Sequence, residues 1–128
     1  MILDYNYPVR QIRLFVPVTR GSTIREADII VYDDELCLAP LIVVECKRQD
    51  ISEAEFIQAI EQAFSYAYFL PGDVKYVWVT SGIRNDFYEV DKNLNTRNQI
   101  PDIPRFGQKL SNWKPYRYVY KAASVLNQ

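Results

Sequence analysis

Two acidic residues and one lysine interrupt apolar, strand-like runs in the first half of the chain. Asp28 lies in the run 27–32, and Glu45 and Lys47 lie in the run 41–47. Burying a charged side chain among such β-branched residues costs free energy, so these charges indicate a functional site. Two opposed carboxylates repel each other, but a divalent cation between them makes the pair favourable, and a neighbouring lysine adds positive charge. These residue types therefore predict a metal site with carboxylate ligands.

The spacing of these residues predicts that their side chains meet. Residues i and i+2 of a strand share a face, so Glu45 and Lys47 project to the same side. If the two runs pair as an antiparallel hairpin symmetric about residues 36–37, Asp28 lies opposite Glu45, with β-carbons roughly 4.5–5.5 Å apart. The alternative is a cross-strand ion network on the surface that binds no ligand.

A helix is predicted to follow the second run and to add polar groups. Residues 52–55 fit the capping-box pattern S-x-x-E, and the Pro-Gly pair at 71–72 ends the helix. Gln58, Gln62 and Tyr66 are spaced at i, i+4 and i+8 and form a polar ridge. Amide and phenol groups suit a phosphate oxygen or a sugar, so we expect the ridge at the rim of the carboxylate site. The alternative is a solvated helix face.

The remaining pattern predicts an α/β domain with a mixed central sheet flanked by helices. Strands are expected at 12–19, 26–33, 41–48, 74–80 and 87–91. Pro17 favours a sheet edge for the first strand, since proline cannot donate to the ladder. The apolar stripe of the helix is expected to be Ile57, Ile60, Phe64 and Ala67. Residues 92–111 have no clear period and are predicted to be a long loop, and 116–121 are predicted to begin a last strand or a helix.

The composition is that of a single globular domain and narrows the chemistry. The chain has 128 residues, of which 48% are hydrophobic and 24% charged. It contains no histidine, which removes His-dependent catalytic triads and His-ligated metals, and Cys37 and Cys46 are too few for a Cys-based zinc site. Oxygen-ligated magnesium, manganese or calcium remains. No membrane span or signal peptide is recognisable, so we expect a cytoplasmic protein.

Charge is distributed unevenly along the chain. Residues 1–64 carry six Lys/Arg and eleven Asp/Glu, whereas residues 65–128 carry nine and five. We divide the single domain, 1–128, into a core at about 7–91 and a basic, aromatic-containing segment, 92–128, whose only acid is Asp102. That segment either follows a nucleic-acid backbone by charge and stacking or is a solubilising loop with a strand packed on the sheet.

An ordered set of residues resembles the motifs of a known superfamily. The set is Asp28, Glu45-x-Lys47 and Gln62-x-x-x-Tyr66. It resembles the D…(D/E)-x-K and Q-x-x-x-Y signatures of the PD-(D/E)XK nuclease superfamily. Over roughly residues 7–90 the chain is most similar to the N-terminal nuclease domain of type I restriction enzyme R subunits. The resemblance implies a restriction-endonuclease-like core and a Mg²⁺-dependent DNA endonuclease of a restriction–modification system.

The resemblance also implies a role for each motif residue. Asp28 and Glu45 would ligate Mg²⁺, or Mn²⁺ in its place, with the main-chain carbonyl of Cys46. Lys47 would either orient and help deprotonate the attacking water or stabilise charge on the phosphate, and both roles remain open. The polar ridge of Gln58, Gln62 and Tyr66 would position the nucleic-acid backbone.

Departures from the superfamily pattern leave alternatives. The chain starts close to the first strand, where the superfamily has a helix that can lend an acid, so Glu26 is a further candidate ligand. No G-x-x-x-x-G-K-[ST] loop occurs, so no ATP site is expected. The expected partners are DNA and the motor, methylation or specificity subunits of a restriction system, with a homodimer left open. The rival function is a catalytically inactive nuclease-fold module that binds nucleic acid or a protein.

Overall fold

A six-stranded mixed sheet forms the centre of the molecule. The computed structural model describes residues 2–107, and the strand order follows the chain. The strands are β1 Ile12–Arg20, β2 Thr23–Tyr32, β3 Pro40–Cys46, β4 Tyr76–Thr80, β5 Asn85–Asp91 and β6 Thr96–Ile100. All neighbours pair antiparallel except β3 and β4, which are parallel. The predicted α/β class with a mixed sheet is therefore confirmed, and β1 occupies the predicted edge.

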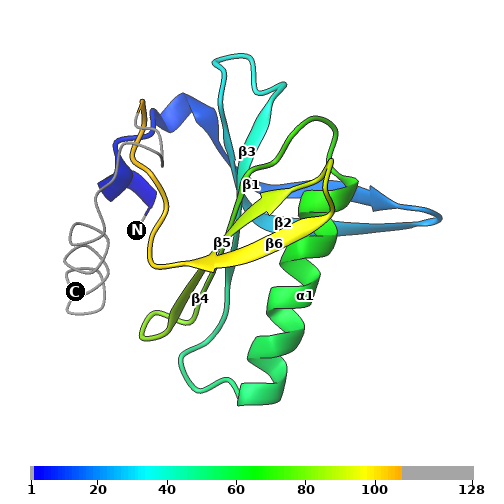
Figure 1. Ribbon diagram of the computed structural model, residues 1–128, viewed down its shortest axis with the longest axis vertical. Helices are drawn as coiled ribbons and strands as arrows, with labels where there is room; N and C mark the ends of the chain where they lie inside the picture. Colours follow the sequence, from blue (N-terminus) through cyan, green and yellow to red (C-terminus); the bar gives the residue numbers. More distant parts are fainter. Residues whose placement is uncertain (1, 108–128) are drawn as a thin grey trace.

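One long helix supplies the connection that the parallel pair requires. Parallel neighbours cannot be joined by a tight turn, and α1 (Glu53–Phe69) crosses from β3 to β4 over one face of the sheet (Figure 1). Its N-cap is Ser52, whose Oγ accepts the Glu55 N–H at 3.2 Å, as the S-x-x-E pattern predicts. Within residues 2–107 no helix is long and apolar enough to cross a membrane.

The opposite face of the sheet is covered by the ends of the described chain. The sequence predicts flanking helices, but α1 is the only α-helix in residues 2–107, beside the 3₁₀ helices η1 Ile2–Tyr5 and η2 Val9–Gln11. Tyr5 packs edge-on against Trp78 with ring centroids 5.6 Å apart, and the Tyr7 hydroxyl donates to the Pro104 carbonyl at 2.8 Å. The N-terminal turns and residues 101–104 thus bury the apolar side chains that a second helix layer would cover.

Two apolar layers follow from strand alternation. Toward α1 lie Ile30, Val43, Val77 and Val79, and away from it lie Ile29, Val31, Val44 and Trp78. The helix packs Phe56, Ala59, Ile60, Ala63 and Ala67 against the first layer. Ile57, expected in the apolar stripe, is 49% exposed instead, so the buried face is rotated from the predicted one.

A last strand occupies part of the expected long loop. Residues 96–100 form β6, which pairs with β5 from Phe87–Ile100 to Asp91–Thr96, so the loop prediction for 92–111 is wrong there. The strand is polar and mostly exposed, and the ladder to β5 stabilises it rather than any apolar pattern of its own. The element expected at 116–121 lies outside the described residues.

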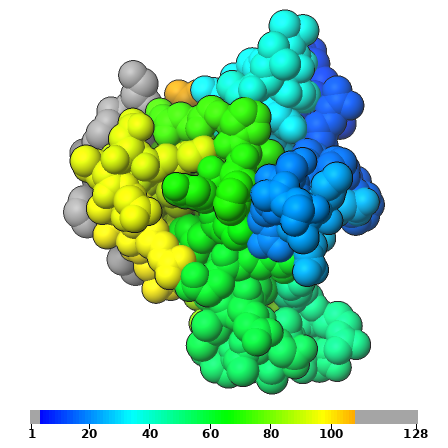
Figure 2. All heavy atoms as spheres, turned by 90° about the vertical axis from the view of Figure 1, so that its right-hand side faces the viewer, coloured from blue at the N-terminus to red at the C-terminus, as the bar shows by residue number. Residues whose placement is uncertain are grey.

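Two arginines hold α1 against the second half of the sheet. The Arg84 guanidinium lies 4.1 Å from the Phe56 ring centroid, and that of Arg97 lies 4.2 Å from the Phe64 ring centroid. Arg97 also binds Glu61 through two hydrogen bonds of 2.7 and 3.1 Å. Figure 2 shows β6, in yellow, beside the green helix on this face. Arg97, one of the basic residues of segment 92–128, is therefore engaged within the protein.

Candidate functional site

The β2–β3 hairpin brings the two motif carboxylates together. The ladder pairs Ile29 with Val44, and the same register places Asp28 opposite Glu45, as predicted. The predicted symmetry about residues 36–37 fails nearer the turn, where the register shifts and Tyr32 pairs with Pro40. The Asp28 N–H donates to Glu45 Oε1 at 3.1 Å, and the Cys46 N–H donates to Asp28 Oδ2 at 2.8 Å. Each acid is thus held by the backbone of the opposite strand. Both lie at the end of the ladder, where β3 leaves the sheet.

Glu45 is a buried carboxyl with little positive charge around it. Only 2% of its surface is exposed. Burial, followed by the nearby Asp28 carboxylate, raises its pKa to about 7, although the Asp28 N–H and Lys47 oppose the rise. A divalent cation would compensate the negative charge of the two carboxylates. Two carboxylates are a donor set that Mg²⁺ accepts while it keeps several waters. No group of three His, Cys, Asp or Glu side chains within residues 2–107 is arranged to hold a metal.

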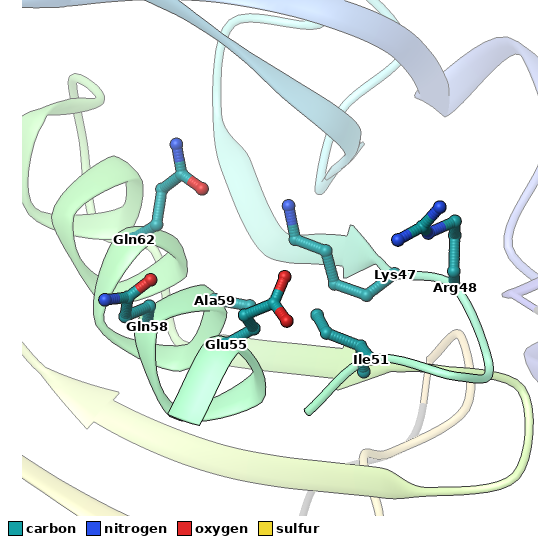
Figure 3. A pocket seen from close by; sticks show the side chains of 7 residues that line it. All are labelled: Lys47, Arg48, Ile51, Glu55, Gln58, Ala59 and Gln62. Carbon is teal, nitrogen blue, oxygen red and sulfur yellow. The ribbon is translucent and has the colours of Figure 1, made fainter. Parts of the chain in front are cut away.

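Lys47 projects from the end of β3 into a cavity beside α1. The backbone N–H of Lys47 donates to the Thr80 carbonyl at 2.8 Å, which extends the β3–β4 pairing by one residue. The cavity has a volume of about 250 Å³ and is lined by Lys47, Arg48, Glu55, Gln58 and Gln62, among others (Figure 3). The structure therefore brings Lys47, Gln58 and Gln62 of the predicted site to one hollow.

The polar ridge of the helix divides between this cavity and the core. Gln58 is exposed and Gln62 half-buried, and both line the cavity. Tyr66 is 1% exposed and packs in the core, so it approaches the site from within and not at an open rim. Burial raises the Tyr66 pKa, and the Glu45 carboxylate adds to the rise. The Gln62 amide nitrogen donates to the Tyr66 hydroxyl at 2.8 Å, so the tyrosine orients the glutamine.

Three residues near the site are not predicted from the sequence. Arg48 and Glu55 line the cavity with Lys47. Arg20, at the end of β1, donates to Ser65 Oγ at 2.9 Å and lies 5.6 Å from the Tyr66 ring centroid, which joins the first hairpin to α1. Its Nε is buried without a hydrogen-bond partner among the described residues. The capping-box pattern marks Glu55 as a helix-start residue, and nothing in the local sequence marks Arg20.

Comparison with protein families gives one match for this chain. Residues 1–104 match the family described as Type I restriction enzyme R protein N terminus. Searches of the curated proteins and of the solved structures returned no match. The matched segment contains the acidic pair, Lys47 and the polar ridge of α1, and it extends over most of the chain. The protein therefore belongs to the family of N-terminal domains of type I restriction enzyme R proteins.

Proposed function

We propose that this domain is a Mg²⁺-dependent DNA endonuclease that hydrolyses phosphodiester bonds within a restriction system. The observation that carries the proposal is the opposed pair of Asp28 and Glu45, in which a buried carboxyl has a pKa of about 7. The negative charge of this pair destabilises the metal-free protein, and a bound divalent cation would compensate it. Membership of the restriction enzyme family supports the same activity.

The arrangement of elements also supports assigning a restriction-endonuclease-like, PD-(D/E)XK core. The acidic hairpin β2–β3 leads directly into α1, and β4 then returns parallel to β3. Glu45 and Lys47 lie at the end of β3, and Asp28 lies opposite Glu45 on β2. Gln58 and Gln62 of α1 line a cavity with Lys47, which Asp28 and Glu45 do not reach. The motif residues therefore belong to one unit of the fold rather than to separate surfaces.

We assign the metal to Asp28, Glu45 and the main-chain carbonyl of Cys46. The donors are all oxygen, as Mg²⁺ and Mn²⁺ prefer. When bound, the ion supplies Lewis-acid chemistry: it polarises the phosphodiester and makes its bound water more acidic. The chain's own contribution is the buried, preorganised pair, because backbone N–H groups already hold each carboxylate in place. Glu45, whose pKa is raised to about 7, would be deprotonated in the metal-bound form.

Lys47 and the helix act on the substrate in this scheme. The Lys47 ammonium lies next to the carboxylate pair in sequence and faces the cavity, where it orients the attacking water or stabilises charge on the phosphate. Gln58 and Gln62 donate amide N–H groups to the DNA backbone. Tyr66, buried in the core, holds the Gln62 side chain in place through its hydroxyl. DNA is therefore expected to approach from the side of the cavity.

The proposed partners follow from the family. The family describes one part of a type I restriction enzyme, and we assign DNA and the motor, methylation or specificity subunits of such a system as the partners of this domain. A second function, binding of nucleic acid or protein without catalysis, is favoured by one observation: the described residues offer Asp28 and Glu45 but no third acidic ligand at the site.

Cleavage of plasmid DNA separates the two functions. The intact chain should convert supercoiled plasmid to nicked or linear DNA with Mg²⁺ or Mn²⁺ and not with EDTA. Asp28→Ala should abolish the cutting and Lys47→Ala should reduce it to a residual rate, whereas Glu35→Gln, which removes an exposed acid from the turn between β2 and β3, should leave it unchanged. If the intact chain binds DNA but neither cuts it nor binds Mg²⁺ by calorimetry, the endonuclease proposal is wrong and the inactive module is supported.

A further inference from the structure

Glu55 faces the same cavity as Lys47, from the opposite wall. Figure 3 shows the Glu55 carboxylate extending from the first turn of α1 toward the space that Lys47 enters from the end of β3. The Lys47 ammonium has three donors. Within residues 2–107 no hydrogen bond or ion pair engages it, so its position depends on what the cavity walls and the solvent offer. A volume of about 250 Å³ has room for several waters between the two groups.

The position of Glu55 is set by its own helix cap. The Ser52 hydroxyl donates to Glu55 Oε1 at 2.8 Å and accepts the Glu55 N–H at 3.2 Å. No described group bonds Oε2, which leaves that oxygen available to the cavity. A carboxylate held in this way is a preorganised acceptor, since little side-chain freedom remains to be lost when it binds a cation or water.

The helix continues this acceptor wall toward the motif residues. Glu55 and Gln62 are seven residues apart and lie on one face of α1. One of the two N–H groups of the Gln62 amide is engaged with the Tyr66 hydroxyl at 2.8 Å, and the carbonyl oxygen lies on the side of Lys47 (Figure 3). A carboxylate and an amide oxygen therefore line the wall that faces the Lys47 ammonium.

We propose that Glu55 is a positioning residue that, with Gln62 and the water between them, holds the Lys47 ammonium beside the Asp28–Glu45 pair. The inference rests on the proposed endonuclease function for its catalytic consequence, and on the cavity geometry alone for the placement of Lys47. Glu55 acts through Lys47 and does not itself touch the metal or the scissile phosphate. Its charge matters because it attracts an ammonium that would otherwise extend into solvent.

The helix supplies a matched control for this role. Glu53 lies in the same first turn, carries the same charge and interacts in the same way with the helix dipole. It pairs with Arg84 and does not line the cavity. Any effect of Glu55→Gln that comes from net charge or the helix dipole should therefore appear in Glu53→Gln as well. The cap itself is kept in Glu55→Gln, because the glutamine side-chain oxygen can accept the same bond from the Ser52 hydroxyl.

Kinetics on plasmid or oligonucleotide DNA test the catalytic consequence. Glu55→Gln should lower kcat by about 10-fold, as for other residues that support a catalytic group, and leave KM within about twofold. Glu53→Gln should change neither, and Glu55→Asp should recover part of the loss. In a Lys47→Ala background Glu55→Gln should have no further effect, measured as residual cleavage. If Glu55→Gln changes KM alone, the inference is overturned. It is also overturned if Glu55→Gln lowers the cleavage rate as much in the Lys47→Ala background as in the native protein.

A spectroscopic measurement tests the placement without any cleavage. In protein labelled with ¹³C and ¹⁵N in lysine, the Lys47 side-chain signals, assigned by their absence in Lys47→Ala, report the mobility of the ammonium. Glu55→Gln should make the Lys47 side chain more mobile on the ps–ns timescale, and Glu53→Gln should not. If the intact chain does not cut DNA but this difference is found, the proposed function fails and the placement stands. If Lys47 moves equally in all three proteins, the placement fails.

Discussion

Glu45→Gln isolates the cost of burying one carboxylate at the candidate site. The residue is 2% exposed, and folding transfers its side chain from water to the interface between the sheet and α1. Glutamine keeps the side-chain carbonyl oxygen that accepts the Asp28 N–H in the native protein. The substitution therefore removes the titratable group and leaves the local hydrogen bond and the packing volume nearly unchanged.

The magnitude follows from the shift in pKa. Burial above all, with the Asp28 carboxylate, raises the Glu45 pKa from 4.5 to about 7. A carboxyl with a raised folded-state pKa contributes stability that is fully present below the unfolded value, 4.5, and is lost as the pH rises through about 7. At about 1.4 kcal/mol per pKa unit, the loss amounts to about 3 kcal/mol by pH 8. Metal-free Glu45→Gln should exceed the native protein in stability by about that amount at pH 8 and by under about 1 kcal/mol at pH 5.

Urea unfolding in EDTA between pH 5 and pH 8 measures this difference. The quantity to compare is the free energy of unfolding of the variant minus that of the native protein, because other groups titrate in both. Glu26→Gln is the control, since it removes an exposed carboxylate from β2 and buries nothing. A difference for Glu45→Gln that is independent of pH, or one that favours the native protein at pH 8, would refute the account of Glu45 as a destabilising buried charge.

Three further predictions concern the metal, the helix end and the basic residues. Because Mg²⁺ competes with the proton on Glu45, its affinity by calorimetry should rise about 10-fold from pH 6 to pH 8, and a flat profile would contradict this. The Lys92 ammonium binds two carbonyls at the end of α1, at 2.9 and 2.8 Å, so Lys92→Met should cost about 2 kcal/mol in urea unfolding, against no loss for exposed Lys75→Met. Arg48→Gln should reduce the slope of log K against log salt for DNA binding by about 1, because Arg48 lines the cavity and its ion pair with Asp50, at 3.6 Å, is long and exposed. Arg97→Gln should not, because two hydrogen bonds of 2.7 and 3.1 Å already hold its guanidinium on Glu61.

The acidic hairpin was predictable because its signals are local. Strand alternation determines the register around Asp28 and Glu45, since one residue of slip would have moved the apolar side chains to the wrong face. The pairing of Ile29 with Val44 confirms that register. The symmetry assumed for the turn is wrong, because the register shifts between Val31 and Tyr32. The helix start was equally local, since Ser52 and Glu55 satisfy each other within one turn. Prediction succeeded wherever neighbouring residues carry the whole interaction.

The errors arise where distant elements decide the outcome. Each step of four residues overshoots a helical turn by about 40°, so Tyr66 is rotated by about 80° from Gln58 and enters the core. Ile57 is exposed because the sheet packs against the neighbouring face of α1, which carries Phe56, Ala59 and Ala63. Residues 96–100 are held by β5 and not by their own pattern. Glu55 lines the cavity only because β3 ends opposite it.

The parallel pairing of β3 with β4 has a consequence for how the protein reaches its native state. The β2–β3 hairpin closes through an adjacent turn, but Ile42 meets Tyr76 only after the chain has passed through all of α1. Loop-closure entropy makes that second pairing the slower one. Glu45 is therefore fully withdrawn from water only when the crossover is completed. We expect the rate of unfolding, rather than the rate of refolding, to carry the pH dependence that this residue causes, with slower unfolding at pH 5 than at pH 8 in the native protein and little change in Glu45→Gln.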